Sequence, residues 1–247
     1  MAPVMPIKAA EPTSKKPPDK VSDSKAWKKS NQVSGLLSKI IQIRVGDRQE
    51  PFQVHKDVLG ASSPFFRNAC KGYWKESMQD WIELPEDDPE IFEVYLQWLY
   101  LKTIEITAGQ DAPQHFAMYE SYKFGDKILD TAFKNAVIDH LIRSVVTNQV
   151  YPTYLAKAVY QNLPASSGFR RLYVDFWAWA SCVEWYDGGA PGIEEAPLEF
   201  FSELSRRQTE IKDKRSVRKE KFPWVIDACQ YHEHAEGSPK CSNKPNK

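Results

Sequence analysis

The stretch FQVHKDVLGASSPFF (residues 52–66) decides the fold, because it carries a strand signal followed closely by a helix signal. Phe52-Gln53-Val54 alternates apolar and polar residues with the period of a half-buried strand. Ser62-Ser63-Pro64 predicts a helix start, since serine is a favoured N-cap and proline at the first helical position loses no needed N–H. The stretch therefore predicts a strand and, soon after it, a helix.

Further strand and helix signals lie on both sides of this stretch. Residues 41–45 alternate as a strand, and residues 46–49 supply the turn chemistry of a hairpin with Phe52-Gln53-Val54. Trp81-Ile82-Glu83-Leu84 predicts another short strand, and a helix with an apolar surface nearly all round follows from Pro89. A last short strand is expected at 104–106.

The rest of the chain predicts helices. We expect two at about 113–128 and 130–146, and a further pair at about 153–162 and 168–186. The last of these is rich in aromatic residues, which at helical spacing indicates a core position against the preceding helices. A charged, exposed helix is expected at 197–221. The predicted fold class is α+β, with a small sheet capped by helices and an all-helical C-terminal extension.

This order of elements, together with four motifs, resembles the BTB/POZ domain family. The motifs are residues 52–66, LPEDDPEIF (84–92), WLY (98–100) and YKFGDK (122–127). The resemblance covers roughly residues 36–146. The aromatic C-terminal half, with CQYHEH (229–234), is further similar to extended fungal BTB-domain proteins.

The resemblance implies a protein-interaction module that self-associates. Some members recruit cullin-type ubiquitin ligase scaffolds or transcriptional regulators. The residues before the first strand are Ser38-Lys39-Ile40, without the aspartate that the family's charged pocket uses. Ile104-Glu105 lies in about the region of the cullin-contacting motif but without its spacing. We therefore predict a self-associating interaction protein, with a ubiquitin ligase adaptor as the alternative.

Three common enzyme motifs are absent from the sequence. The chain has no Gly-x-Ser-x-Gly elbow, no Gly-Lys-Ser phosphate loop and no Gly-x-Gly-x-x-Gly stretch. His55 stands at a predicted join between strand and helix, where a structural histidine is the favoured interpretation. We predict that the protein is not an enzyme and needs no cofactor, apart from the zinc considered below.

Composition limits the partners and the compartment. The 247 residues carry 33 Lys+Arg and 33 Asp+Glu, which argues against a generic polyanion binder. The longest strongly apolar run, residues 176–183, is far shorter than the ~20 residues of a membrane helix. Residues 1–30 contain no apolar block of a secretory signal. The expected location is the cytoplasm or the nucleus, with other proteins as partners.

The chain divides into four predicted parts. Residues 1–32 form a disordered, basic, proline-rich arm, since few of its residues can be buried. Residues 36–146 form the BTB/POZ-like domain, and 147–200 form a helical extension packed on it. Residues 201–247 form a charged helix and a tail that contains cysteine and histidine.

Basic residues gather in 206–221, where eight Lys and Arg oppose three acidic residues and leave a net charge of +5. One interpretation is a nuclear regulator that binds nucleic acid through this segment. The interspersed acids and the lack of stacking aromatics favour a solvated helix face instead.

Cys229, His232, His234 and Cys241 bring two thiols and two imidazoles into one short segment. Zinc prefers four such ligands in a tetrahedron. Histidines two residues apart share a side of an extended strand, and Gly237-Ser238-Pro239 is able to turn Cys241 back toward them. The alternative is a polar tail in which these residues are incidental or pack on the domain, and both interpretations stay open at this point.

Overall fold

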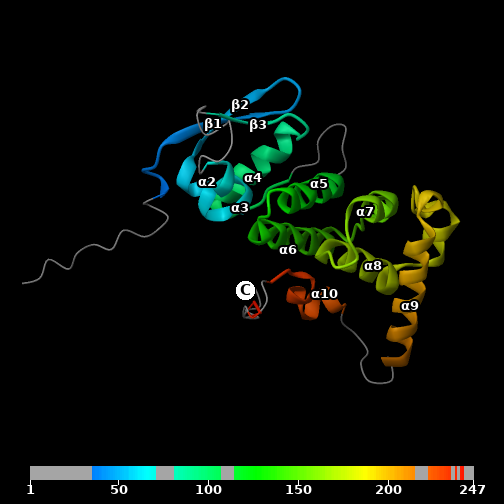
Figure 1. Ribbon diagram of the computed structural model, residues 1–247. Helices are drawn as coiled ribbons and strands as arrows, with labels where there is room; N and C mark the ends of the chain where they lie inside the picture. The colour runs from blue at the N-terminus through cyan, green and yellow to red at the C-terminus, as the bar shows by residue number, and fades with distance from the viewer. Residues whose placement is uncertain are drawn as a thin grey trace, which may run out of the picture.

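A small sheet with adjoining helices forms one half of the protein, and a helical assembly forms the other (Figure 1). The computed structural model describes residues 35–70, 81–106, 114–214, 222–234, 237 and 240–241. The predicted basic arm at 1–32 lies outside the described residues. This architecture confirms the α+β class and the small sheet followed by helices.

The sheet has three strands in the order β2-β1-β3. Strand β1 (Ile40–Val45) pairs antiparallel with β2 (Glu50–His55) and parallel with β3 (Trp81–Leu84). Alternate residues of β1 point into the core, and Ile43 and Val45 are fully buried. The period-2 pattern in the sequence therefore set both the strand and its buried face. In the described part of the chain, β2 and β3 are the edge strands.

Three helices of the described chain adjoin the sheet, and side chains cap the starts of two of them. Helix α2 (Lys56–Ser62) follows β2 directly, and α3 (Pro64–Ala69) begins after Ser63. The Ser63 hydroxyl accepts a hydrogen bond from Phe66 N and donates to the Ile128 carbonyl at 2.6 Å. Helix α4 (Pro89–Leu101) is capped by Asp88, as the sequence predicts.

The Asp130 carboxylate connects three of these helices. It caps α6 (Thr131–Asn148) by accepting from Phe133 N at 3.0 Å. It also accepts from Ser62 Oγ at the end of α2 (2.5 Å) and from Tyr95 Oη on α4 (3.1 Å). Burial raises the pKa of Tyr95, and the neighbouring Asp130 raises it further. One buried carboxylate thus satisfies donors from the sheet half and from the centre of the molecule.

Two paired helices occupy the centre, and further helices extend from them (Figure 1). Helix α5 (Gln114–Lys127) packs on α6, and α7 (Ala156–Asn162) follows the 3₁₀ turn η2 (Thr153–Leu155). Helix α8 (Gly168–Ala180) buries its aromatic face, including Phe169, Tyr173, Phe176 and Trp177. This confirms the predicted core role of these aromatics. The described residues contain no helix with the length and apolarity needed to cross a membrane.

Three expectations about elements differ from the structure. Ile104 and Ile106 are buried, but residues 103–106 pair with no strand among the described residues. Helix α8 ends at Ala180 rather than near 186, because Ser181 is extended (ψ 143°), and a separate π-helical turn, η3 (Trp185–Gly189), follows. A helix, α2, already begins at Lys56, before the helix start predicted at residues 62–64, and its interior Gly60 weakens the helical signal of this segment.

The helix expected to be charged and exposed at 197–221 is amphipathic and packed. Helix α9 (Leu198–Lys214) follows the 3₁₀ turn η4 (Ile193–Glu195) and buries Phe200, Leu204 and Ile211. Its Glu199 and Glu203 carboxylates pair with the buried Arg170 guanidinium of α8. The apolar residues are widely spaced among charges, so charge dominates the sequence pattern although one stripe is buried.

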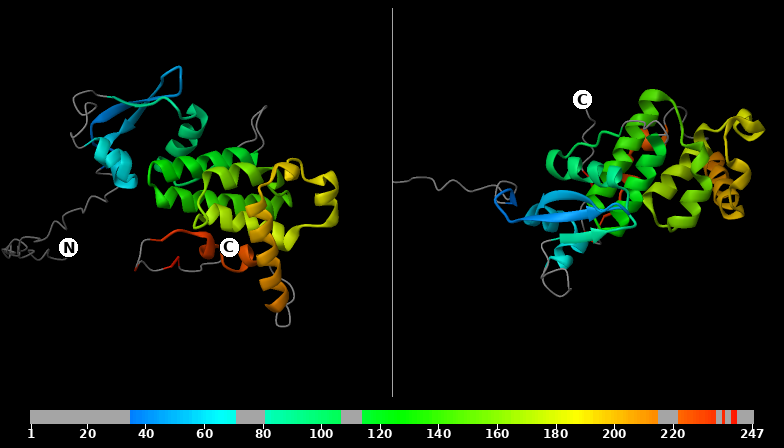
Figure 2. Two further views of the ribbon diagram at one scale, coloured as in Figure 1. Left: turned by 45° about the vertical axis from the view of Figure 1, so that its right-hand side comes forward. Right: turned by 90° about the horizontal axis from the view of Figure 1, so that it is seen from above.

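The C-terminal segment (residues 222–234) folds back across the centre of the molecule (Figure 2). It contains α10 (Pro223–Ile226) and η5 (Ala228–Tyr231), and η5 contacts both α6 and α8. The Asn135 side chain of α6 makes two hydrogen bonds with the Glu233 backbone, each 2.9 Å. The Glu233 carboxylate accepts from Tyr122 Oη on α5 (2.5 Å) and from Lys134 Nζ on α6 (2.6 Å).

Burial and hydrogen bonds shift the pKa values of Tyr122 and Glu233. Burial raises the pKa of Tyr122 to about 12, and the hydrogen bond to Glu233 adds to the shift. Burial alone would raise the pKa of Glu233, but the hydrogen bonds from Lys134 and Tyr122 outweigh it and hold that pKa below its usual range. Glu233 is therefore a carboxylate that links the C-terminal segment to α5 and α6.

A glycine at the start of α8 permits the close approach of this segment. A Cβ built on Gly168 lies only 1.9 Å from the Tyr231 carbonyl oxygen, and the Gly168 N–H donates to Tyr122 Oη at 3.1 Å. No L side chain fits there unless η5 moves away from α8.

We expect Gly168→Ala to destabilise the protein by about 1–3 kcal/mol, because overpacking moves backbone rather than a flexible side chain. Urea unfolding followed by circular dichroism measures this effect. The control is Gly60→Ala in α2, whose added Cβ meets its nearest atom at 3.6 Å. The control should be neutral or slightly stabilising. Equal stability of the two variants would contradict the close packing of η5 on α8.

We expect Glu203→Gln to lower the free energy of unfolding by about 1–2 kcal/mol at neutral pH, because it weakens the contact between α8 and α9. This value is already reduced for the partial exposure of Glu203. Burial opposes ionisation of Glu203, but Arg170 and Tyr160 donate to its carboxylate and hold its pKa below the usual range. Its contribution should therefore be complete above the unfolded pKa of about 4.3 and disappear as the pH falls through the lower folded pKa.

Urea midpoints of the wild type and Glu203→Gln between about pH 7 and pH 3 test this. The two curves should converge at the acid end. Glu195→Gln, whose partner Lys157 is exposed, is the control and should differ little from the wild type at any pH. A difference that stays constant down to the acid end would contradict a role for the ionised carboxylate.

Candidate functional site

The structure brings the four predicted metal-ligating residues together at the C-terminal end of the chain. The nitrogen and sulfur atoms of Cys229, His232, His234 and Cys241 all lie within 4.8 Å of one another. Cys229 Sγ is 3.2 Å from His234 Nε2, and Cys241 Sγ is 3.2 Å from His232 Nδ1. We call these four residues the Cys/His cluster. No other group of this kind is found in the described part of the chain.

Local backbone geometry places each member of the cluster. Cys229 lies in η5, whose start is capped by the Asp227 carboxylate accepting from Cys229 N at 3.0 Å. His232 is extended (φ −77°, ψ 152°), so His234 lies on the same side of the chain. Gly237 has φ +77°, a conformation that glycine adopts readily, and Cys241 returns to the cluster after it.

Two residues of the Cys/His cluster are buried and the other two are exposed. Cys229 is 7% exposed and the His232 side chain 6%, whereas His234 and Cys241 are exposed. His232 Nε2 lies 3.0 Å from the Asp139 carboxylate of α6. Burial raises the pKa of the Cys241 thiol, and the adjacent Cys229 raises it further. Sequence analysis missed Asp139, since 93 residues separate it from His232.

His55, considered above as a structural histidine, lies where β2 meets α2. The Tyr100 hydroxyl accepts from the His55 backbone N–H at 3.0 Å and lies 2.9 Å from its Nδ1. His55 therefore connects the end of α4 to the point where β2 meets α2, a contact consistent with the predicted structural role.

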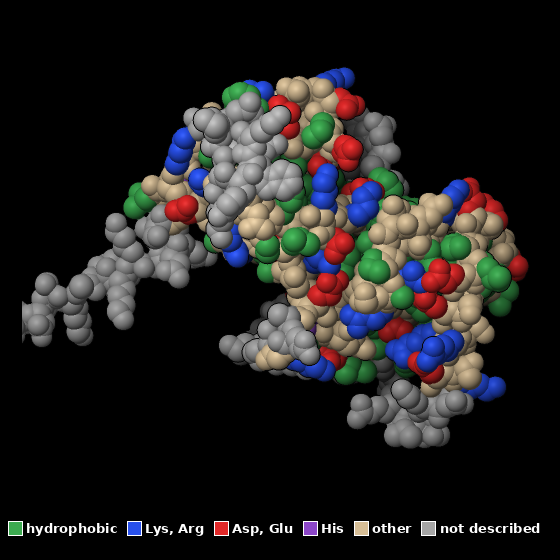
Figure 3. All heavy atoms as spheres, in the orientation of Figure 1, with side chains coloured by type: hydrophobic (Ala, Val, Ile, Leu, Met, Phe, Trp, Pro, Cys, Tyr) green, Lys and Arg blue, Asp and Glu red, His purple; other side chains and the backbone are tan. Residues whose placement is uncertain are grey.

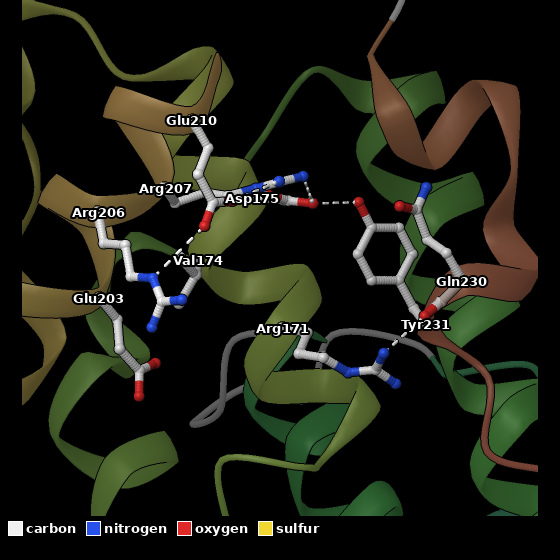
Figure 4. Close-up of a pocket in the computed structure, with 9 residues that line it drawn as sticks. All are labelled: Arg171, Val174, Asp175, Glu203, Arg206, Arg207, Glu210, Gln230 and Tyr231. Atoms are coloured by element: carbon white, nitrogen blue, oxygen red, sulfur yellow. Dashed lines mark hydrogen bonds and ion pairs between the residues drawn. The ribbon is translucent and has the colours of Figure 1, made fainter. Parts of the chain in front are cut away.

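A pocket of about 480 Å³ lies between α8, α9 and η5 (Figure 4). In this view the Arg207 guanidinium and the Tyr231 hydroxyl approach Asp175 from opposite sides. Arg207 Nε lies 2.5 Å from Asp175 Oδ1, and Tyr231 Oη donates to Asp175 Oδ2 at 2.5 Å. The complete lining is Arg171, Val174, Asp175, Glu203, Arg206, Arg207, Glu210, Gln230 and Tyr231.

The charges of this pocket compensate one another. Three arginines face three carboxylates, and Arg206 and Arg207 both pair with Glu210. Burial and the Asp175 charge raise the pKa of Tyr231, so its hydroxyl stays protonated. Nucleophilic Ser, Cys, Lys and His are absent from the lining. The pocket is lined by paired polar groups that hold η5 against α8 and α9. Its lining presents no nucleophile next to a base.

The basic segment 206–221 is described only in its first part. Arg206 and Arg207 are engaged with Glu210 and Asp175, and residues 215–221 lie outside the described residues. Over the face shown in Figure 3, acidic and basic side chains intermingle across the helical half. The described part of this segment therefore offers few unpaired cations to a phosphate backbone.

An exposed apolar surface lies at one end of the sheet. Leu36, Leu37 and Ile40 are 47%, 70% and 50% exposed. Hydrogen bonds from Lys56 N to the Lys39 carbonyl and from Asp57 N to Ser38 Oγ hold this segment beside the start of α2. We call Leu36, Leu37 and Ile40 the N-terminal apolar surface. The sequence placed these residues near the first strand but gave no sign of which would stay exposed.

Comparison with known proteins finds similarity in the part of the chain that contains the sheet. The family model described as BTB/POZ domain matches residues 41–131. Among solved structures, the BTB domain of human gigaxonin is 21% identical, covering 41% of this chain and 75% of that chain with a TM-score of 0.32. The BTB domain of zebrafish PATZ1 is 20% identical, covering 44% of this chain and 75% of that chain with a TM-score of 0.32. Residues 41–131 of this protein are a BTB/POZ domain.

Proposed function

We propose that the protein acts by binding other proteins, first of all a second copy of itself, and that it catalyses no reaction. A BTB/POZ domain is a protein-interaction module, and residues 41–131 match that family. The observation that carries the self-association proposal is the N-terminal apolar surface beside β1 and α2. A partner that covers these exposed leucines removes apolar surface from water, which favours association.

Two further features support association through this half. Within the described residues, strands β2 and β3 are the two edges of the sheet, and the edge of a sheet can pair with a strand from another chain. Ile40 pairs in register with His55, and the His55 and Tyr100 ring centroids lie 5.9 Å apart, so the end of α4 lies near this surface. A symmetric dimer presents the same patch on both copies, and a stable one buries about 800 Å² on each.

The described side chains give no support to a reaction centre. Arg207 and Asp175 of the pocket between α8, α9 and η5 form an ion pair, and His55 is bound to Tyr100. The adaptor alternative also lacks a supporting contact, because Ile104 is buried and only Glu105 of that pair is exposed. We therefore do not extend the proposal to a cullin scaffold.

The full chain at tens of micromolar should sediment as a dimer. The double variant Leu36→Asp and Leu37→Asp should raise the dimer dissociation constant about a hundredfold or more, since each leucine removed from an interface costs about 1.5–3 kcal/mol. Analytical ultracentrifugation measures both species, and circular dichroism checks that the variant is folded.

Leu198→Asp is the control, because Leu198 is even more exposed than these leucines (84%) but lies at the start of α9. It should dimerise like the wild type. A monomeric wild type would overturn the proposed self-association. A double variant that dimerises as tightly as the wild type would overturn the choice of surface.

A further inference from the structure

The Cys/His cluster has the ligand spacing of a tetrahedral metal site. Bonds of about 2.3 Å to sulfur and 2.0–2.1 Å to nitrogen place the ligands of a tetrahedral zinc ion about 3.3–3.8 Å apart. Cys229 Sγ and His234 Nε2 are 3.2 Å apart, and Cys241 Sγ lies 3.2 Å from His232 Nδ1 and 3.8 Å from His234 Nε2. The remaining pairs stay within 4.8 Å.

A contact outside the cluster orients one of its imidazoles. His232 Nε2 lies 3.0 Å from Asp139 Oδ1, so the carboxylate accepts the ring proton and leaves the Nδ1 lone pair directed at Cys241. A histidine that binds a metal typically donates its other N–H to a carboxylate in this way. The Cys241 backbone N–H also donates to Cys229 Sγ at 3.3 Å, which holds the two cysteines next to each other.

Together these contacts point to a metal that accepts sulfur and nitrogen. Two thiolates and two neutral imidazoles suit zinc and do not suit calcium or magnesium, which take oxygen ligands. Four protein ligands leave no open position for substrate, which is typical of a structural site. Half of the ligand set is buried against α6, so a bound ion fixes the end of the chain to the centre of the fold.

We propose that Cys229, His232, His234 and Cys241 bind one Zn²⁺, with Asp139 as the positioning residue for His232. The ion closes the loop from residue 229 to residue 241 and fastens it on α6. This role is independent of self-association through the N-terminal apolar surface.

Elemental analysis of the full chain, purified under reducing conditions without chelator, tests the proposal directly. We expect one zinc per chain. Replacement of zinc by Co²⁺ should give the visible bands of a tetrahedral cobalt centre and a thiolate charge-transfer band. Cys241→Ser and His234→Ala should both abolish the zinc and the cobalt spectrum, and because both side chains are exposed these variants should fold.

Two further variants separate a metal site from mere packing. Cys182→Ser removes an exposed thiol elsewhere and should keep zinc at the wild-type level. Asp139→Asn should still bind one zinc but with about 10–100-fold lower affinity in a chelator competition. Chelator should lower the unfolding temperature of the wild type and leave that of Cys241→Ser unchanged.

Three results would overturn the proposal. The first is wild-type protein without zinc that also gives no tetrahedral cobalt spectrum when Co²⁺ is added. The second is a Cys229–Cys241 disulfide, seen by mass spectrometry of alkylated protein, in place of two free thiols. The third is zinc retained at full stoichiometry in both Cys241→Ser and His234→Ala.

Discussion

The contact on which the rest of the structure depends is the Glu233 carboxylate, held between the Tyr122 hydroxyl and the Lys134 ammonium group. Only 29% of the Glu233 side chain and 6% of the Lys134 side chain are exposed, so the three groups need one another to stay satisfied. Tyr122 lies on α5, Lys134 on α6, and Glu233 near the end of the chain. Because Asn135 also binds the Glu233 backbone in both directions, the C-terminal segment is integral to the fold rather than a tail.

Hydrogen bonds at α5 and α6 link these central helices to both halves of the protein. Tyr122 Oη also accepts from the Gly168 N–H, which joins α5 of the BTB/POZ domain to the first turn of α8. In the other direction, Asp130 at the start of α6 connects α2 and α4. Two buried carboxylates thus fasten the sheet half and the helical half to the central helices α5 and α6. A rigid framework of this kind suits a protein that presents a fixed surface to a partner, since little conformational entropy is then lost on binding.

Sequence reasoning succeeded where the deciding signal is local. The alternation in β1, the strand at 81–84 and the helix start after Asp88 follow from periods and caps within a few residues. It failed at 104–106, because two buried isoleucines with a charge between them resemble a strand whether or not a partner strand is near. The four residues of the Cys/His cluster were found because they are close in sequence. Asp139 and the Tyr122–Glu233 contact were not, since they join positions 93 and 111 residues apart.

The central claim is that residues 228–234 unfold together with α6 and α8. Native-state hydrogen exchange of the full chain measures this most directly, because it reports an opening free energy for each protected amide. We expect the amides of His232 and Glu233, bonded to the Cys229 carbonyl and to Asn135 Oδ1, to open with the same free energy as the interior of α6, within about 1 kcal/mol. Exchange of these two amides about a thousandfold faster than α6 would show a tail that detaches by itself and would contradict the account.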